Sequence, residues 1–332
     1  MSPPTTAPST PTKPTILISG ASSGFGRTLA LLSLARGYNV IATSRSLSSL
    51  AGICPPSSPH FSSFCPLALD VTASDGALRS LASAAARKFG GVTHVFACAG
   101  YILDGAWEES SSSELASQFA TNVLGMVGAV RAFLPHLRAA GESWKSSPSA
   151  APRPGILTFG SLGSWTSGSG TSLYCGTKWA CSGLTEGLKE EMRPFGVDVM
   201  VVEPGMFRTG FLSSSSSTTT TEGGGGSHRI LTAKSLPIYS GPGGPVHATR
   251  QALDSADDKQ VGDTEKGCNL ILDVMMRTGK MEGREEVPVR LPLGKDAIDV
   301  IRGKCQETLK LLEEWEELAV GTAHDDGISL YN

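Results

Sequence analysis

The sequence lacks any long hydrophobic run. No apolar stretch approaches the roughly 18 residues that a membrane-spanning helix needs. The run Ile16–Ile18, which follows a Pro/Thr-rich N-terminus, is too short for the core of a signal peptide. We therefore expect a cytoplasmic protein with no transmembrane segment.

Close cysteine pairs and an excess of one charge are also missing. Seven cysteines, an odd number, are scattered along the chain, which is typical of reduced thiols in an intracellular protein. The six histidines are equally dispersed, so we expect no metal site. Lys and Arg number 28 against 31 Asp and Glu, a net charge of −3, and this balance gives no electrostatic attraction to nucleic acid.

What the sequence does contain is a regular alternation of short apolar runs and helical patterns. Predicted strands cover residues 15–19, 39–43, 64–71, 92–97, 155–159, 197–202 and 287–293. Predicted helices cover about 27–36, 74–89, 111–139, 172–193, 264–276 and 295–318. Strands joined by helices in this rhythm indicate right-handed crossovers and a parallel sheet. We therefore predict an α/β fold of the Rossmann type, a doubly wound seven-stranded parallel sheet with helices on both faces, in a single domain.

Composition sets the limits of this domain. The predicted organisation is a disordered tail (1–14), one domain (15–320) and a C-terminal tail (321–332). Residues 140–154 are predicted as a surface insertion before the fifth strand. The Ser/Thr/Gly tract 213–227 cannot build a core. Because it follows the sixth strand, where an open α/β sheet holds its ligand crevice, we expect a mobile substrate lid over about 206–245.

A glycine-rich turn follows the first predicted strand and opens the first predicted helix. It has the sequence Gly20-Ala21-Ser22-Ser23-Gly24-Phe25-Gly26. Glycines at this place let the backbone approach a pyrophosphate, which then lies at the positive end of a helix. An ordinary tight strand–helix turn is the alternative, but the position at the first strand favours a dinucleotide site.

The end of the second predicted strand lacks the acidic residue with which an NAD site binds the ribose hydroxyls. Ser44 and Arg45 stand there instead. A hydroxyl and a cation suit a 2′-phosphate, so we expect NADP(H) as the cofactor. A solvated surface arginine is the alternative for Arg45.

Ser161, Tyr174 and Lys178 form a third set. Tyr174 and Lys178 are four residues apart and share one face of a predicted helix. A nearby ammonium lowers the pKa of a phenol from about 10, which makes the phenol an acid or base near neutrality. Ser161 lies thirteen residues before the tyrosine, where its hydroxyl can hold a substrate carbonyl oxygen. A tyrosine and lysine at this spacing are usually a surface pair, and the serine is what favours a catalytic site.

In these motifs the chain resembles the classical short-chain dehydrogenase/reductase family, over about residues 15–210. The resemblance implies an NAD(P)-dependent Rossmann enzyme that acts on alcohols and carbonyls. It implies a catalytic set of Asn122, Ser161, Tyr174 and Lys178, in which Asn122, Tyr174 and Lys178 also contact the cofactor. The further cofactor contacts that it implies, beyond the glycine turn and Ser44-Arg45, are Asp70, Val71, Ala99, Gly100, Pro204, Gly205, Phe207 and Thr209.

One motif departs from the family pattern. The family's Asn-Asn-Ala-Gly after the fourth strand is Ala97-Cys98-Ala99-Gly100 here. The change removes side-chain hydrogen bonds that brace the centre of the sheet, while Gly100 still permits close approach to the cofactor. We interpret Cys98 as a small buried apolar residue without a redox role.

The expected function is hydride transfer between NADP(H) and a carbonyl/alcohol pair on a hydrophobic small molecule. Residues 289–297 and the helix that follows resemble the subgroup near hydroxysteroid and retinol dehydrogenases, with many fungal and bacterial members. Steroid-, retinoid- or secondary-metabolite-like ketones and aldehydes are therefore the expected substrates. Two alternatives stay open: a non-catalytic dinucleotide-binding redox sensor, and an epimerase or dehydratase on the same fold.

The substrate pocket and the assembly depend on weaker signals. An apolar pocket is expected to use Trp165, Phe207, Phe211, Leu212 and Tyr239. The family commonly pairs through the crossover helices, here 111–139 and 172–193, and we expect a homodimer or homotetramer. The apolar face of the first of these helices carries Val123, Val127, Val130 and Leu134. Packing of these four residues into the core is the alternative.

Overall fold

The computed structural model describes residues 13–148, 153–215, 228–284 and 286–322. The predicted N-terminal tail up to residue 12, the C-terminal tail from 323 and the low-complexity residues 216–227 lie outside the described ranges. The predictions of a disordered tail and of a mobile tract at these positions therefore stay predictions.

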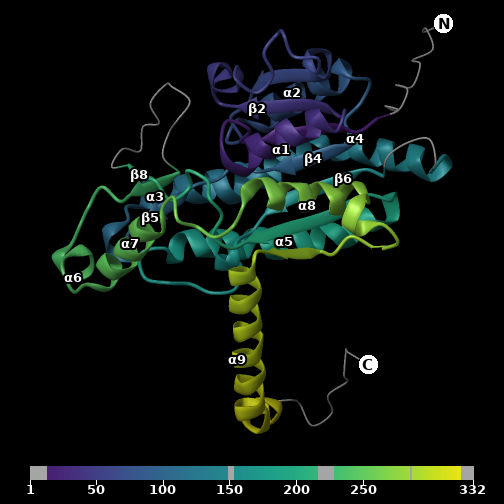
Figure 1. Ribbon diagram of the computed structural model, residues 1–332. Coiled ribbons are helices and arrows are strands. Elements are labelled where there is room, and N and C mark those ends of the chain that lie inside the picture. Colours follow the sequence, from purple (N-terminus) through teal and green to yellow (C-terminus); the bar gives the residue numbers. More distant parts are fainter. Residues whose placement is uncertain (1–12, 149–152, 216–227, 285, 323–332) are drawn as a thin grey trace, which may run out of the picture.

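Seven parallel strands form the main sheet, in the order β10-β7-β6-β4-β1-β2-β3 (Figure 1). They are β1 (Thr15–Ser19), β2 (Asn39–Ser44), β3 (Phe64–Ala68), β4 (His94–Ala97), β6 (Gly155–Phe159), β7 (Asp198–Pro204) and β10 (Arg290–Leu293). Each neighbouring pair runs parallel. The predicted seven-stranded, doubly wound sheet is confirmed.

The central strands are buried on both faces, as a covered parallel sheet requires. Every residue of β1, β4 and β6 is buried. Most of them are apolar, because side chains there pack between two helical layers. Ser19 is polar and buried, and its hydroxyl accepts a hydrogen bond from the backbone N–H of Cys98 at 3.1 Å. This bond braces the loop after β4, where the family's paired asparagines are missing.

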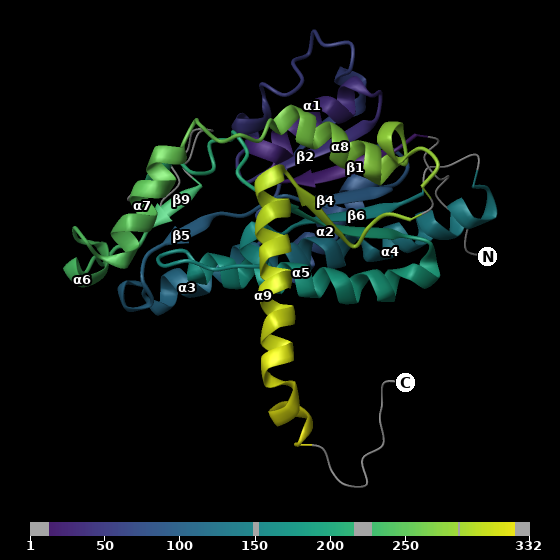
Figure 2. The ribbon, with the colours of Figure 1, turned by 60° about the horizontal axis from the view of Figure 1, so that its bottom comes forward.

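Helices cover both faces of the sheet, as Figure 2 shows. On one face are α1 (Gly24–Ala35) and α8 (Thr264–Met276). On the other are α2 (Asp75–Lys88), α4 (Gly125–Ser146) and α5 (Ser172–Met192). Ile16 and Ile18 of β1 pack into the first layer and Leu17 into the second, because successive side chains of a strand point to opposite faces.

Two predicted elements have different limits in the structure. The predicted helix 111–139 consists of α3 (Ser112–Phe119), a π-helical turn η4 (Ala120–Leu124) and α4, which continues to Ser146. Residues 140–146 are therefore helical and not part of a surface loop, because Ala140 and Gly141 are buried. The third strand ends early, since Asp70 turns the chain by accepting the backbone N–H of Thr72 at 2.9 Å.

A second, smaller layer lies beyond the carboxyl ends of the main strands. We call it the cap layer and define it as β5 (Ile102–Asp104), β8 (Ser214–Ser215), β9 (Arg229–Leu231), α6 (Pro237–Ser240) and α7 (Pro245–Ala256). Its three strands are parallel, in the order β5-β9-β8. β5 follows β4 and the other elements follow β7, so the layer joins two distant parts of the chain.

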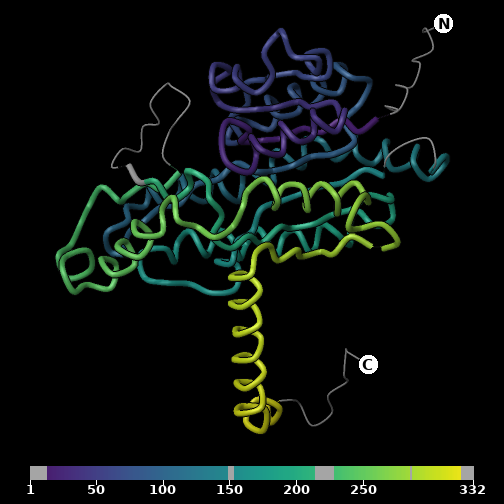
Figure 3. The backbone as a smooth tube through the Cα atoms, viewed as in Figure 1, coloured from purple at the N-terminus to yellow at the C-terminus, as the bar shows by residue number. Residues whose placement is uncertain are grey.

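The last helix, α9 (Lys295–Val320), leaves the domain as a single projecting rod (Figure 3). Ala297 is its only buried residue among 26. Short 3-10 turns complete the described structure at Leu47–Leu50, Phe61–Ser63, Trp107–Glu109, Leu162–Ser164, Arg193–Phe195 and Gly279–Met281.

Candidate active site

The glycine turn lies where the strand order of the main sheet changes direction. From β1 the chain leads outward to β2 and β3, and then returns to β4 on the other side of β1. Open α/β sheets bind ligands in the crevice outside the carboxyl ends of the strands at such a switch point. The predicted cofactor residues that follow β1, β2, β4 and β7 therefore converge on this edge of the sheet.

The glycine turn has no side chains at Gly20 and Gly24, and its backbone packs closely against the loop after β4. Gly20 has φ +67° and Gly24 has φ +49°, a left-handed conformation that side chains disfavour. A Cβ on Gly20 would lie 2.9 Å from the Cα of Ala99, and a Cβ on Gly24 would lie 3.6 Å from the Cβ of Thr209. These residues fit a dinucleotide diphosphate, because bare backbone at a helix N-terminus offers N–H groups to an anion.

The predicted phosphate-selecting pair lies at the end of β2. The Ser44 hydroxyl is 2.8 Å from that of Ser49, and Arg45 is exposed. Along the same edge, the exposed carboxylate of Asp70 accepts the hydroxyl proton of Thr72 at 2.7 Å. Val71, by contrast, is buried. The side chains that could meet an adenosine phosphate are therefore those of Ser44 and Arg45, while the Asp70 carboxylate could accept a hydrogen bond from an adenine amino group.

Two predicted contact residues place their rings in the core. The rings of Phe25 and Phe207 lie 5.2 Å apart, and Phe25 also packs 5.3 Å from Phe159. Phe207 is 8% exposed and packs within this core, so the part of its side chain that could line the substrate pocket is small, and that role stays a prediction. Its backbone stays near the site, since its carbonyl accepts the Thr209 N–H at 2.8 Å.

The turn after β7 is fixed by the base of α9. The N–H of Gly205 donates to the carbonyl of Leu293 at 2.9 Å. The carboxylate of Asp296 accepts the N–H of Met206 at 2.6 Å and fills the space that a side chain on Gly205 would need. The predicted Pro204-Gly205 turn thus reaches Thr209 along a well-supported backbone.

Ser161, Tyr174 and Lys178 lie together, as expected. Ser161 is close enough to Tyr174 to oppose the rise in the pKa of its phenol. The Lys178 Nζ donates to the Phe159 carbonyl at 2.8 Å and lies 5.7 Å from the centroid of the Tyr174 ring. Tyr174 and Lys178 are both buried. A hydroxyl, a phenol and an amine therefore surround one point beside the crevice.

Burial controls the protonation of this group. It raises the pKa of Tyr174 above the ordinary value of 10.0, and the nearby Ser161 hydroxyl opposes that rise. It also lowers the pKa of Lys178. The expected lowering of the tyrosine pKa is therefore wrong for these residues, and Tyr174 keeps its proton at neutral pH. The protonated phenol is the form that donates a proton to a carbonyl oxygen.

Asn122 lies in the π-helical turn η4, a distortion that is frequent at functional sites. Its Oδ1 accepts the backbone N–H of Tyr101 at 3.0 Å, and its Nδ2 donates to the hydroxyl of Thr177 at 3.0 Å. A Cβ on Gly100 would lie 3.2 Å from this Oδ1 and 3.7 Å from the Lys178 Nζ. The four residues of the predicted catalytic set thus converge on the crevice next to Gly100.

Two of the predicted pocket residues flank Tyr174. The ring of Phe211 lies 6.1 Å from the tyrosine ring. Leu212 is buried with Tyr174 and Ile102 in a small apolar cluster. The phenol is therefore approached over an apolar surface.

His228, which the sequence did not single out, contacts the glycine turn. Its Nε2 lies 2.7 Å from the Ser23 hydroxyl, and its ring stacks on Phe211 at 5.9 Å. Burial, with the nearby charge of Arg45, lowers the pKa of His228. A neutral imidazole, able to donate or accept a hydrogen bond, therefore faces the diphosphate position. Its place directly after the low-complexity tract left no periodic signal that could have identified it.

A buried carboxylate behind Ser161 also escaped prediction. Glu203, fully buried in β7, accepts hydrogen bonds from Ser182, Trp165 and Arg290 at 2.7, 2.7 and 2.8 Å. The Ser182 hydroxyl also lies 2.9 Å from that of Ser164, and the Ser164 hydroxyl accepts the backbone N–H of Ser161 at 3.2 Å. The indole of Trp165, predicted in the pocket, is held by this network. The sequence signal that could have identified Glu203 is a single acidic residue within an otherwise apolar predicted strand.

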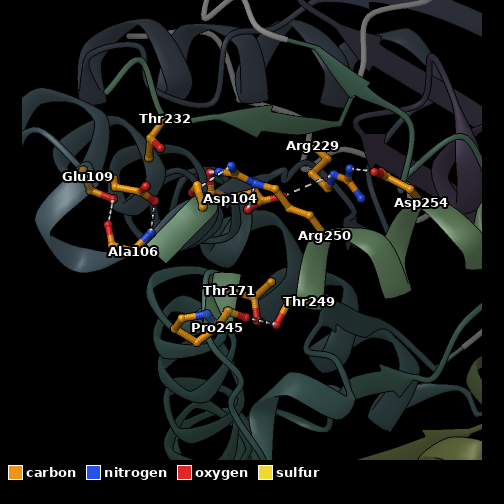
Figure 4. A network of polar contacts seen from close by, with 12 residues as sticks. Asp104, Ala106, Glu109, Thr171, Arg229, Thr232, Pro245, Thr249, Arg250 and Asp254 are labelled. Atoms are coloured by element: carbon orange, nitrogen blue, oxygen red, sulfur yellow. Dashed lines mark hydrogen bonds and ion pairs between the residues drawn. The ribbon is translucent and has the colours of Figure 1, made fainter. Parts of the chain in front are cut away.

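A charged network attaches the cap layer, as Figure 4 shows. Asp104, buried at the end of β5, lies 3.5 Å from Arg229 of β9 and 2.9 Å from Arg250 of α7. Arg229 also pairs with Asp254. Burial raises the pKa of Asp104, while the charges of Arg250 and Arg229 oppose the rise.

Two glutamates hold the following stretch of the cap layer by its backbone. Glu109 accepts the N–H of Leu236 at 2.7 Å, and Glu114 accepts the N–H of Ala233 at 2.8 Å. Burial alone would raise both pKa values, but the hydrogen bonds to the carboxylates outweigh it, so both are lowered. Tyr239, predicted in the pocket, donates its hydroxyl proton to Glu108 at 2.9 Å.

Comparison with known proteins decides the family. Residues 14–220 match the short chain dehydrogenase family. The chain belongs to this family. This short-chain dehydrogenase is 30% identical over 308 residues to the oxidoreductase BOA17 of Botryotinia fuckeliana (strain B05.10). The aligned region covers 92% of this chain and 98% of that protein.

Two further comparisons extend the assignment. Over 209 residues the enzyme is 32% identical to human 17-beta-hydroxysteroid dehydrogenase type 1, covering 59% of this chain and 58% of that one. A short-chain dehydrogenase structure from Streptomyces avermitilis has a TM-score of 0.74 at 30% identity, with 93% of this chain and 98% of that chain covered. The resemblance inferred from the motifs is confirmed, and the protein is an oxidoreductase of this family.

Two absences concern the described part of the short-chain dehydrogenase only. None of its helices is both long and apolar enough to cross a membrane. In the same residues, no group of three or more His, Cys, Asp and Glu side chains could hold a metal ion.

Proposed function

We propose that this short-chain dehydrogenase reduces a ketone or aldehyde on a hydrophobic small molecule, with NADPH as the hydride donor. The observation that carries the proposal is the buried set of Ser161, Tyr174 and Lys178 beside an open glycine turn. Reduction uses the protonated phenol of Tyr174, which is its form at neutral pH. The reverse oxidation needs the phenolate and becomes easier as the pH rises.

Four residues of the site have separate roles in the proposed reaction. When bound, the nicotinamide ring supplies the hydride. The Ser161 hydroxyl donates a hydrogen bond to the substrate carbonyl oxygen, and Tyr174 donates its proton to that oxygen as the alcohol forms. The Lys178 ammonium, 5.7 Å from the tyrosine ring centroid, stabilises the phenolate that remains. Asn122 fixes the loop of Gly100 and Tyr101 that borders the same space.

The preference for NADPH depends on the end of β2. Arg45 is exposed at the crevice edge, and Ser44 adds a hydroxyl beside it. A guanidinium pairs well with a phosphate, whereas the second strand carries no acid there that would favour NADH. Arg45 therefore supports selection of the phosphorylated cofactor.

The substrate class depends on the apolar approach to Tyr174. Phe211 and Leu212 flank the phenol, so a substrate with an apolar body beside its carbonyl fits better than a polar one. The human relative is named for 17-beta-hydroxysteroids, and this agrees with a bulky apolar substrate class.

We also propose that the enzyme forms a homodimer or homotetramer through the outer faces of α4 and α5. Val123 and Val130 are buried in the core, so they are not available for this contact. Leu124, at the end of η4 next to α4, and Trp179 and Leu184 of α5 are 66%, 49% and 46% exposed, and they provide an apolar outer surface.

The test is a turnover assay of the purified full chain with NADPH or NADH and a panel of ketones matched in reactivity. The panel pairs each apolar ketone with a polar one of the same carbonyl environment. We expect turnover with NADPH and with the apolar members. Tight dinucleotide binding without turnover on any member would contradict the proposal and favour a redox sensor.

A further inference from the structure

The projecting helix α9 exposes a broad apolar surface to solvent. Beyond its first turn, most of its large apolar side chains are more than half exposed. The exposed fractions are 60% for Leu309, 55% for Leu311, 61% for Leu312, 54% for Trp315, 68% for Leu318 and 65% for Val320. Helices of this kind obtain most of their stability from packing of an apolar face. Nothing in the described part of the chain covers this face.

One stripe of α9 follows a seven-residue repeat. Of the exposed side chains named above, Leu312 and Trp315 lie in this stripe, and Leu309, Leu311 and Leu318 border it. Positions alternately three and four residues apart form one stripe along the helix: Ile298, Ile301, Cys305, Thr308, Leu312, Trp315 and Ala319. This spacing is the pattern of a helix that packs against another helix along its length. With 26 residues, α9 offers about 39 Å of such a seam.

The charges of α9 show which helix fits the stripe. Residues 295–310 carry four basic and three acidic side chains, a net charge of +1. Residues 311–320 carry four glutamates and no basic residue, a net charge of −4. A second α9 in the antiparallel direction brings the acidic half of each helix against the basic half of the other. A parallel pair would place the two acidic halves together.

The residues that flank the stripe give the same orientation. Arg302 and Glu316 are fourteen residues apart, two repeats, and so border the stripe on the same side. In an antiparallel pair, Arg302 of each copy faces Glu316 of the other, and flanking charge pairs of this kind set helix orientation. The present partner of Arg302 is Asp299 at 3.4 Å, an exposed pair that holds it only weakly.

We propose that two copies of the protein associate through α9 as an antiparallel helix pair. This interface is separate from the one proposed for α4 and α5. It concerns the mass of the assembly, so it holds or fails independently of the proposed reaction.

The first experiment measures molar mass by light scattering and sedimentation across micromolar concentrations. Compared are the full chain, Leu312→Glu/Trp315→Glu and, as a control on the polar face, Lys310→Gln. We expect the double variant to have half the mass of the full chain and the control to keep it. A monomeric full chain, or a double variant with unchanged mass, would overturn the proposal. Retained NADPH binding shows that the double variant is folded.

The second experiment tests the orientation by exchanging charges. Arg302→Glu and Glu316→Arg each place like charges together at two symmetric positions, so we expect each to raise the dissociation constant about tenfold. The combined variant restores opposite charges and should return to within about threefold of the original. If the combined variant is no tighter than the single ones, the antiparallel pair is wrong. Unchanged mass in these variants, with loss of mass on replacing Leu124 or Trp179, would assign the contact between copies to the crossover helices alone.

Discussion

The main sheet and the cap layer meet at Tyr174, yet they are stabilised by different interactions. Two extensive apolar clusters hold helices to the faces of the sheet. The apolar cluster of the cap layer has four buried members, namely Ile102, Tyr174, Cys175 and Leu212. Buried carboxylates supply the rest of its attachment. The sheet therefore depends on apolar area, which is insensitive to charge, whereas the cap layer depends on charge pairing and on the protonation of a few acids.

This difference separates cofactor binding from substrate turnover. The glycine turn and Arg45 belong to the apolar half, while the approach to Tyr174 depends on the cap layer. Changes to the cap layer should alter turnover more than dinucleotide binding, to which His228, next to β9, contributes through its contact with Ser23. The following predictions test this separation, beginning with the largest expected effect.

Replacing the phenol at the junction should give the largest loss. In Tyr174→Phe the ring remains but the proton donor is gone, so we expect kcat to fall by roughly 10²–10⁴, as for loss of a general acid. NADPH affinity, measured by fluorescence titration, should stay within about twofold, because apolar packing is conserved. Tyr38→Phe, in a tyrosine that packs against the sheet-side cluster, is the control. Substantial turnover in the first variant would place the acid elsewhere.

Removing the central acid of the charged network should release the cap layer alone. Asp104→Asn removes the anion that buried Arg229 shares with partly exposed Arg250, and breaking a buried pair costs about 3–5 kcal/mol. Arg229 keeps Asp254 as a second partner. We expect faster hydrogen exchange in residues 229–256 and unchanged exchange in β1 and β4, measured by mass spectrometry.

The control is a substitution of Asp254, the second partner of Arg229. The Asp254 side chain is 60% exposed, so Asp254→Asn should cost only about 0–1 kcal/mol. Equal effects of the two substitutions would mean that burial of Asp104 does not determine the attachment. Loss of exchange protection in the main sheet as well would mean that the two regions unfold as one unit.

The preference for NADPH over NADH should depend on Arg45, at the end of β2, and not on the cap layer. Arg45→Ala should reduce the preference for NADPH over NADH by about tenfold, or about 1.4 kcal/mol, since one charge-assisted phosphate contact is lost. The measurement is kcat/KM for both cofactors. Arg79→Ala, in an exposed arginine of α2, should leave the ratio unchanged. An unchanged ratio in the first variant would show that Arg45 is only a solvated side chain.

Acidification should loosen the cap layer slightly before it affects the sheet. The pKa values of Glu109 and Glu114 are lowered from 4.5, so their contribution is complete above 4.5 and is lost as the pH falls through the lower folded values. The raised pKa of Asp104 acts in the opposite direction. We therefore expect only a few-fold rise in exchange of residues 229–236 below pH 4.5, corrected for intrinsic rates. A Glu114→Gln variant with the same pH profile would exclude this glutamate as a cause.

The fold could be predicted because its signals are local. Each main strand is a short apolar run, and the glycine turn and the Tyr174–Lys178 spacing lie within single segments. The attachment of the cap layer could not be predicted, since Asp104 and Arg229 are far apart in the sequence and a low-complexity tract precedes the arginine. The direction of the Tyr174 pKa depends on burial, which no spacing in one segment reveals. The same applies to the ring of Phe207, which faces the core.

The charged network around Asp104 also sets limits on exchanging specificity between enzymes of this kind. Asp104, Glu109 and Glu114 come from residues 101–118 and their partners from residues 229–256, so neither stretch is complete without the other. A graft of the later stretch alone would carry Arg229 and Arg250 onto a host lacking their acid. Engineers who wish to transplant a substrate preference must therefore move both stretches as one cassette, and the dinucleotide half of the host can remain untouched.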